Sequence, residues 1–253
     1  MTYMSLERTT GLILKSIKYS DTDRIITCYT HKYGKIQCIA KRARRQKSNF
    51  LSNIDLLTYA ELVIVKKGIK NIYPLREAVI IQSYHRLYED PPRLYAAFYM
   101  AELIQELTPA EDKKPEILSL ILRQLDMLQK GEDREKLTLI FEVRLLSLLG
   151  YQPQLEKCLF CLAPVESSKM GFIPSMGGIV CQSCCQKKHI SCPSISLGSL
   201  NFLRQAIKFP LNKTDRLCLT SSNRKELLSL LHAFITYHLC REIRSYRFIQ
   251  LSC

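Results

Sequence analysis

The sequence lacks the common motifs of enzyme active sites. It has no Gly-x-x-x-x-Gly-Lys-Ser/Thr loop, no Gly-x-Gly-x-x-Gly, no His-Glu-x-x-His and no Gly-x-Ser-x-Gly. Its 5 histidines are scattered along the chain. No group of carboxylates has the pattern of a two-metal nuclease. We therefore expect no catalytic residues and a protein that is not an enzyme.

Long hydrophobic runs are also missing. The sequence has no stretch of about 18 apolar residues, the minimum for a membrane-spanning helix. Near the N-terminus the only apolar run is Leu12–Leu14, which is too short for a secretory signal. We expect a cytoplasmic protein without membrane contact. In that reducing compartment its 11 cysteines are free thiols or metal ligands more often than disulfides.

Acidic residues are scarce, and the charge is unevenly distributed. The chain has 23 acidic against 37 basic side chains, a net charge of +14. Residues 1–80 hold 15 basic and 6 acidic side chains, a net of +9, and residues 151–253 hold 13 and 5, a net of +8. The middle segment, 81–150, holds 9 and 12, a net of −3. Two basic segments around an acidic one indicate a surface for polyanionic partners.

Residues 9–81 have the pattern of β structure. Apolar and polar side chains alternate, and β-branched and aromatic residues are frequent. The turn-forming runs Ser20–Asp23 and His31–Gly34 separate the first segments. Five strands are predicted, over Thr10–Tyr19, Arg24–Thr30, Lys35–Ala40, Leu57–Val65 and Ile72–Ile81. Such a series is typical of a small barrel, either an OB-fold, which commonly binds oligonucleotides, or an SH3-like barrel.

The pattern becomes helical after Asp90-Pro91-Pro92. Two prolines disfavour helix before them and favour a helix start after them. Apolar residues then recur at helical spacing over 94–104, 118–128 and 137–148, with Gly150 ending the third segment. Two further helices are predicted over 196–208 and 227–237. The expected fold class is therefore α+β, with an N-terminal barrel followed by helices.

Two Cys-x-x-Cys pairs are the strongest local signal. Cys158 and Cys161 form the first pair, and Cys181 and Cys184 form the second. Each turn brings two thiolates to one ion, and two turns complete a tetrahedron of sulfur around Zn²⁺. Four thiolates leave no position open for water, so the sequence predicts one structural zinc ion in a small finger.

The segment after the second pair contains rival ligands, namely Cys185, His189 and Cys192. Two other interpretations of the four cysteines stay open: they form redox-active disulfides, or they are inert buried thiols.

A basic run lies between the third and fourth predicted strands. Five cations occur within seven residues, at Lys41, Arg42, Arg44, Arg45 and Lys47. Such a loop can track a phosphate backbone, while aromatic rings stack on unpaired bases. The candidate rings are Phe50, Tyr29 and Tyr33. The alternative is a solvated loop that Phe50 anchors to the core.

Further arginines extend this prediction. Arg24 begins the second strand, where it either contacts phosphate or pairs with Asp21 or Asp23. Near the C-terminus three arginines follow an apolar helix and either complement its dipole or add to the basic surface. They are Arg241, Arg244 and Arg247.

The order of these features resembles the bacterial RecO family of recombination mediators. The resemblance spans the whole chain, and Leu162 and Arg42 depart from it because glycine is usual at both positions. The segments that carry it are Gly11–Lys15 with Tyr19–Arg24, Tyr33-Gly34-Lys35 with Ala40–Arg45, Phe141–Leu146 with Leu149–Pro153, Phe172 with Gly177-Gly178 before Cys181, and the tail from His238 through Arg241, Arg244 and Arg247-Phe248.

The resemblance implies an architecture with three parts. They are an OB-fold over residues 1–82, a helical domain over 83–154 and 193–253, and a zinc-finger insertion over 155–192. It also adds Lys35 to the candidate nucleic-acid-binding residues. Some family members lack the cysteines, which would make zinc dispensable to the core function.

The resemblance further implies what the protein does. It would bind single- and double-stranded DNA in the nucleoid and anneal complementary strands. With RecR it would help to load RecA onto DNA coated by single-stranded-DNA-binding protein. The residues alone leave two alternatives open, an RNA-binding barrel with a zinc ribbon and a protein adaptor that binds no oligonucleotide.

Overall fold

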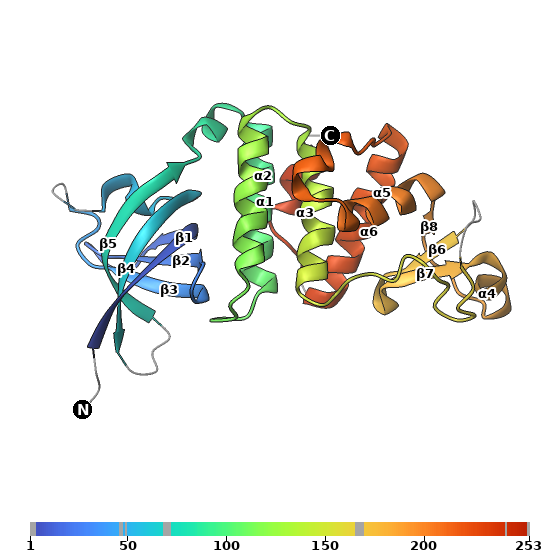
Figure 1. The fold of residues 1–253 in the computed structure, drawn as a ribbon, viewed down its shortest axis with the longest axis horizontal. Coiled ribbons are helices and arrows are strands. Elements are labelled where there is room, and N and C mark those ends of the chain that lie inside the picture. The colour runs from blue at the N-terminus through green and yellow to red at the C-terminus, as the bar shows by residue number, and fades with distance from the viewer. Residues whose placement is uncertain are drawn as a thin grey trace. The chain divides into compact units, whose positions relative to one another are not determined.

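The chain forms an N-terminal barrel followed by helices and a small sheet, as the computed structural model in Figure 1 shows. The structure describes residues 4–45, 48, 50–67, 72–164, 170–240 and 242–251. The predicted α+β class is confirmed. The chain divides into a first unit, residues 1–131 with 245–253, and a second unit, residues 132–244. The three domain ranges given above stay predictions.

All five predicted strands are present. They are β1 (Met4–Lys18), β2 (Arg24–Thr30), β3 (Gly34–Ala40), β4 (Thr58–Lys67) and β5 (Ile72–Ser83). Their order is β1-β2-β3-β5-β4, and the barrel closes because β1 pairs with both β2 and β4. Five strands in a closed barrel of this kind form an OB-fold.

β1 begins earlier than its pattern indicates. Its first part pairs with β4 and its second part pairs with β2, with a bulge between Ile13 and Lys15. The predicted strand began at Thr10 because the preceding residues show little apolar alternation. In the structure Leu6 in this first part is 69% exposed, so burial does not define this end of the strand. Pairing with β4, a non-local interaction, extends this end of the strand.

The barrel interior is filled by the alternate residues of its strands. Ile13, Ile26, Ile36 and Leu62 are each almost completely buried there. Gly34, the first residue of β3, has a φ of +62°, and a Cβ atom at this position would overlap the backbone of Asp112. The hairpin therefore needs glycine, both for its backbone conformation and for its close approach to the segment after the first long helix.

Seven α-helices and four 3-10 helices are found in the described residues. The α-helices are α1 (Pro91–Leu107), α2 (Pro115–Gln129), α3 (Arg134–Leu148), α4 (Gln182–Lys187), α5 (Leu197–Lys208), α6 (Ser221–Leu239) and α7 (Tyr246–Leu251). The 3-10 helices are η1 (Leu51–Ile54), η2 (His85–Glu89), η3 (Pro174–Met176) and η4 (Leu211–Arg216). The five long helices confirm the predicted segments.

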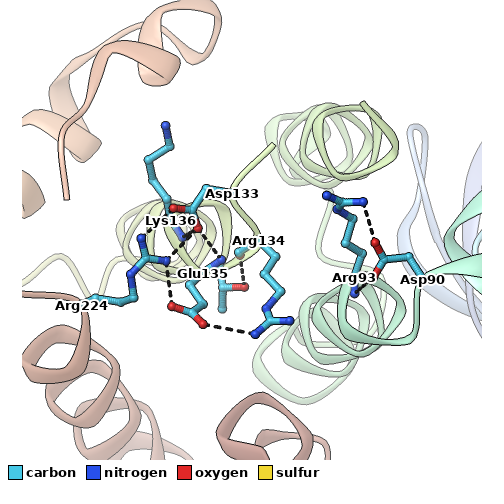
Figure 2. A network of polar contacts seen from close by, with 8 residues as sticks. Asp90, Arg93, Asp133, Arg134, Glu135, Lys136 and Arg224 are labelled. Atoms are coloured by element: carbon cyan, nitrogen blue, oxygen red, sulfur yellow. Dashed lines mark hydrogen bonds and ion pairs between the residues drawn. The ribbon is translucent and has the colours of Figure 1, made fainter. Parts of the chain in front are cut away.

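Side-chain caps explain where several helices begin. Asp90 accepts a hydrogen bond from the Arg93 N–H and precedes the two prolines of α1. Asp133 accepts from the N–H groups of Glu135 and Lys136 at the start of α3. These oxygens satisfy backbone donors that have no partner within the helix. Figure 2 shows both caps, one in each unit.

A small sheet and the C-terminal helix complete the two units. In the second unit the sheet order is β7-β6-β8, formed by β6 (Met170–Ile173), β7 (Gly178–Cys181) and β8 (Ser194–Ile195). In the first unit Phe248 of α7 stacks on Tyr95 of α1, with ring centroids 5.0 Å apart. No helix in the described part of the chain is long and apolar enough to cross a membrane.

Candidate metal centre and nucleic-acid interface

Four cysteine sulfurs converge in the second unit. The Sγ atoms of Cys158, Cys161, Cys181 and Cys184 all lie within 4.8 Å of one another. The Sγ atoms of Cys161 and Cys181 are 3.8 Å apart. Zinc–sulfur bonds of about 2.3 Å in a tetrahedron require sulfur atoms roughly 3.8 Å apart. The predicted four cysteines therefore form a cluster that can hold one metal ion.

The first Cys-x-x-Cys pair lies in a tight turn. The Leu162 N–H donates to the carbonyl oxygen of Cys158 over 3.1 Å, and the Cys158 N–H donates to Ala163 over 3.0 Å. Leu162 has a φ of 59°, in the left-handed region. The turn is held beside β7 because the Leu159 N–H donates to the Ile179 oxygen over 2.9 Å.

The second pair lies where β7 passes into α4. Cys181 is the last residue of β7 and Cys184 lies in the first turn of α4. The Cys181 N–H points to the Cys158 sulfur over 3.4 Å. A short hairpin and one helical turn thus present two thiols to the thiols of the first turn.

Backbone dipoles favour a thiolate at the buried member of the cluster. Burial alone would raise the pKa of the Cys158 thiol. The N–H groups of Cys161, Cys181 and Phe160 outweigh burial and lower this pKa to about 6. In contrast, the neighbouring Cys181 thiol, followed by burial, raises the pKa of Cys184 to about 12. Four thiolates at these distances require a cation to offset their repulsion.

The rival ligands do not join this cluster. Among the described residues, the one group of three or more possible ligands contains Cys184 but neither Cys185, His189 nor Cys192. The sulfurs of Cys185 and Cys192 face each other instead, 3.8 Å apart. The side chain that follows Cys184 in α4 cannot point to the same place, because successive helical residues lie about 100° apart.

The basic run forms a turn at one end of the barrel. Lys41, Arg42, Arg44 and Arg45 are exposed, whereas Ala43 between them is buried. Lys47 lies outside the described residues. The buried Ala43 anchors the turn, so four cationic side chains project from a fixed backbone into solvent.

Hydrogen bonds hold this turn against the β1–β2 connection. The Arg42 N–H donates to Asp23 Oδ1 over 2.9 Å, and the Arg44 N–H donates to the Thr22 oxygen over 3.0 Å. The Arg44 guanidinium donates to the Ser20 oxygen over 3.0 Å. The hydrogen bond from Arg42, followed by that from Thr22, lowers the pKa of Asp23.

Arg24 lies beside the basic turn but has a partner that the sequence did not indicate. It pairs with Ala40 in the β2–β3 register, directly before Lys41. Its Nη1 lies 3.0 Å from Asp55 Oδ1. The expected partners were Asp21 or Asp23, but the Asp23 carboxylate accepts from the basic turn instead. Arg24 remains half-buried in a pocket of about 510 Å³ that Lys15 and His85 also line.

The aromatic candidates are not free for base stacking. Phe50 is 6% exposed and belongs to the barrel core, as in the anchoring alternative. Tyr29 is fully buried, and its hydroxyl donates to the carbonyl oxygens of Asp112 and Lys114. The Tyr33 ring is covered by the Lys66 ammonium, 4.7 Å from its centroid. Because burial or a cation covers these rings, they are not available to stack on bases.

Lys35 stabilises a helix end. Its ammonium donates to the carbonyl oxygens of Gln105 and Thr108 at the C-terminal end of α1. Cations at this end of a helix satisfy free carbonyls and complement the helix dipole. Lys35 therefore has an internal role in the first unit that its position in the sequence did not reveal.

A groove on the outer face of the barrel was missed by the sequence interpretation. It measures about 780 Å³ and is lined by residues that include Lys15, Lys66, Ile17, Ile25 and Gln37. Ile17 and Ile25 are directly opposite each other in the β1–β2 register, and Ile17 is 44% exposed. Strand alternation counted from the buried Ile13 would turn Ile17 inward, but the bulge between Ile13 and Lys15 turns it outward, and only the strand register places it beside Ile25.

The described C-terminal arginines belong to different units. Arg244 is exposed and belongs to the second unit. Arg247 belongs to the first unit, where its guanidinium covers the Phe248 ring at 4.7 Å. Arg241 lies outside the described residues. The role of these residues in DNA binding stays a prediction.

Comparison with known proteins places both parts of the chain in one family. The family model described as recombination protein O, N terminal, matches residues 4–84. The model described as recombination protein O, C terminal, matches residues 88–247.

Curated relatives are similar over nearly the whole length. A protein of Desulfitobacterium hafniense named DNA repair protein RecO is 30% identical over 247 residues, 96% of this chain and 89% of the relative. A protein of the same name from Desulfatibacillum aliphaticivorans is 31% identical over 249 residues, 96% of this chain and 95% of the relative. Another, from Syntrophus aciditrophicus, is 28% identical over 249 residues, 97% of this chain and 95% of the relative.

Proposed function

Because the chain belongs to the recombination protein O family and therefore acts in DNA repair, we propose that its barrel binds DNA and that the protein anneals complementary strands. The observation that carries this proposal is the basic turn, in which Lys41, Arg42, Arg44 and Arg45 are exposed on a fixed backbone. Each phosphate that a cation neutralises releases condensed counterions, which favours binding without regard to sequence.

The outer groove offers a second surface of the first unit for an unpaired strand. Ile17 and Ile25 form an apolar strip on which bases can lie. The groove is also lined by the cations Lys15 and Lys66 and by the carboxylates Glu106 and Glu111. Contacts with base faces and phosphates suit both strands of any sequence. The proposed binding is therefore tolerant of sequence, as annealing requires.

Annealing by this surface needs no catalytic residue. Two single strands repel each other through their phosphates, and a cationic surface lowers this repulsion for both. The proposed function is therefore that of a DNA-repair mediator that works by binding. We propose that its partners on DNA are RecR and single-stranded-DNA-binding protein. RecA would be an indirect partner, through RecR.

We also propose that the cysteine cluster holds one structural Zn²⁺. Four sulfur ligands are typical of closed zinc sites, and the sulfur spacing fits such a site. The ion would tie α4, which has no buried residue, to the largely buried β6–β7 hairpin.

The first experiment is a titration of a labelled single-stranded oligonucleotide with the full-length protein at several salt concentrations. We expect fluorescence anisotropy to show tight binding that weakens steeply with salt and varies little with sequence. Absence of binding at low salt would leave a protein adaptor as the better account. Stronger competition by RNA than by DNA of the same length would instead favour the RNA-binding alternative.

A second experiment tests the mediator role separately. Complementary strands coated with single-stranded-DNA-binding protein are mixed with the protein, and duplex formation is followed. RecA filament formation on coated DNA is then compared with and without RecR. Binding without acceleration of either process would retain the DNA interface and remove the annealing and loading roles.

A further inference from the structure

Cys185 and Cys192 form a second pair of thiols beside the metal centre. Their Sγ atoms are 3.8 Å apart, which is van der Waals contact for two sulfur atoms. Cys185 lies in α4 and Cys192 lies before β8. Neither belongs to the four-cysteine cluster, so metal binding does not account for their proximity.

The backbone between the two cysteines folds back on itself. The Ile190 N–H donates to the carbonyl oxygen of Cys185 over 3.0 Å, and the Lys188 N–H donates to Cys184 over 3.0 Å. His189 has a φ of 51°, which reverses the chain after α4. This local structure returns the chain to Cys185 and brings Cys192 opposite it.

A glycine in the neighbouring strand leaves room for both sulfurs. A Cβ atom at Gly171 of β6 would overlap the Cys192 sulfur and would lie 3.4 Å from the Cys185 sulfur. Both sulfurs thus approach the β6 backbone at one point where no side chain separates them. The close pair depends on two segments of the module and not only on the loop between the cysteines.

We propose that Cys185 and Cys192 are a reversible thiol-oxidation site, at which a small-molecule disulfide converts them into an intramolecular disulfide. Both cysteines are partly exposed, so such a reagent can reach them. The cysteines of the barrel core, Cys28 and Cys38, are fully buried and are not candidates.

The reaction balances as two thiol–disulfide exchanges. The thiolate of one cysteine attacks a sulfur of glutathione disulfide, which forms a mixed disulfide and releases one glutathione. The thiolate of the second cysteine then attacks the protein sulfur of that mixed disulfide and releases the second glutathione. The protein loses two electrons and two protons, and the reagent gains them as two thiols.

The new bond would close the segment 185–192 and tie the end of α4 to the chain that enters β8. Cys184, a member of the cluster, lies directly before this ring. We therefore expect the oxidised module to release its metal ion to a chelator more slowly than the reduced module. Oxidation would leave the four cluster cysteines on the metal.

The test uses the full-length, metal-loaded protein and glutathione disulfide. After oxidation the free thiols are alkylated, the protein is digested without reduction, and peptides are identified by mass spectrometry. We expect a peptide in which Cys185 and Cys192 are joined, with the loss of two hydrogen atoms and of both alkylation sites. Bound metal should be unchanged, and dithiothreitol should restore both alkylation sites.

Cys185→Ser and Cys192→Ser should abolish the joined peptide, whereas Cys218→Ser, at an exposed cysteine elsewhere in the unit, should not. The wild-type map decides the question even if a variant folds poorly. The proposal is overturned if both cysteines stay alkylated while Cys218 reacts. It is also overturned if only mixed disulfides form, or if the bond links cluster cysteines and the metal is lost.

Discussion

Arg42 and Leu162 share one backbone conformation, a φ of 59° in the left-handed region. Arg42 lies in the basic turn and Leu162 lies in the first turn of the metal centre. The resemblance described in the sequence analysis implies glycine at both positions. The structure gives the reason for that glycine, because a residue with a Cβ atom is strained at this φ.

Leu162→Gly should stabilise the metal-loaded protein. Leu162 is 67% exposed, so its side chain contributes little burial. Glycine relieves a left-handed strain of roughly 1–2 kcal/mol, and the greater freedom of glycine in the unfolded chain offsets part of this gain. We expect the free energy of unfolding to rise by up to about 1 kcal/mol, measured by urea denaturation.

Leu162→Ala is the matched control, because alanine removes the same exposed side chain but keeps the Cβ atom. It should give no comparable gain. Equal stabilisation by glycine and alanine would show that loss of the leucine side chain, and not the backbone conformation, causes the effect.

Removing the exposed cations of the basic turn should lower the salt dependence of DNA binding. The triple variant Lys41→Ala, Arg42→Ala and Arg45→Ala retains Arg44, whose guanidinium holds the Ser20 oxygen. If each lost cation contacts one phosphate, the slope of log K against log salt should fall by about 0.7 per contact for a single strand. Fluorescence anisotropy at several salt concentrations measures this slope.

A charge-matched variant separates a local effect from net charge. Arg86, Lys113 and Lys130 are exposed in the same unit and lie outside the basic turn and the groove. Their replacement by alanine should change the slope by less than the basic-turn variant does. Equal effects of both triple variants would contradict the assignment of the turn as a phosphate-binding surface.

Removing one cysteine of the cluster should cause a loss of metal and of local structure that is confined to the second unit. Cys158→Ser removes a fully buried member of the cluster. We expect the metal content to fall from one ion per chain to none, and the module around β6, β7 and α4 to lose protection from hydrogen exchange. Elemental analysis and hydrogen exchange measure these two effects.

Cys240→Ser changes an exposed cysteine outside the cluster and serves as the control. It should retain both the metal and the protection. Full metal content in Cys158→Ser would show that another residue replaces this ligand.

Much of the fold was predictable because it depends on local patterns. Strand alternation identified all five barrel strands, and proline with helical spacing identified the starts of α1 and α2. The spacing of Cys158, Cys161, Cys181 and Cys184 identified the cluster, because a Cys-x-x-Cys turn fixes the distance between its own thiols.

What could not be predicted depends on partners distant in sequence. Lys35 is occupied by carbonyl groups at the end of α1, and Arg24 pairs with Asp55, neither of which any local pattern indicates. A phenylalanine at position 50 is compatible with stacking on a base and with packing in the core, and the sequence does not distinguish the two. Cys185 and Cys192 also needed the three-dimensional structure, since their approach involves Gly171 of another strand.

Lys35→Ala should destabilise the first unit and leave the salt slope of DNA binding unchanged. The Lys35 ammonium donates to two carbonyl groups at the end of α1, and these lose their partner in the variant. Loss of such charge-assisted hydrogen bonds costs about 1–3 kcal/mol. Denaturation and anisotropy together decide between this role and the nucleic-acid contact that the family resemblance implied. Normal stability with a reduced slope would restore the phosphate contact.

Asp133 should make the stability of the second unit depend on pH in the acid range. Its carboxylate pairs with Arg224 over 2.7 Å, and Arg224 also pairs with Glu135 (Figure 2). The hydrogen bond from Arg224 lowers the pKa of Asp133 from 3.8 to about 2, against the opposing effect of burial. A lowered pKa means that the folded state favours the charged form. The stabilisation is therefore present above about pH 4 and is lost as the pH falls towards 2.

Asp133→Asn isolates this charge, because asparagine still caps the start of α3. Asp133 is 36% exposed, so solvent screening limits the expected loss near neutral pH to about 1 kcal/mol. The difference between wild type and Asp133→Asn should shrink as the pH falls from 5 to about 2.5, because protonation removes the same charge from the wild type. Asp133→Ala loses the cap as well, and should cost about 1 kcal/mol more at every pH. A difference between wild type and Asp133→Asn that stays constant with pH would show that the pair with Arg224 contributes no net stability through its charge.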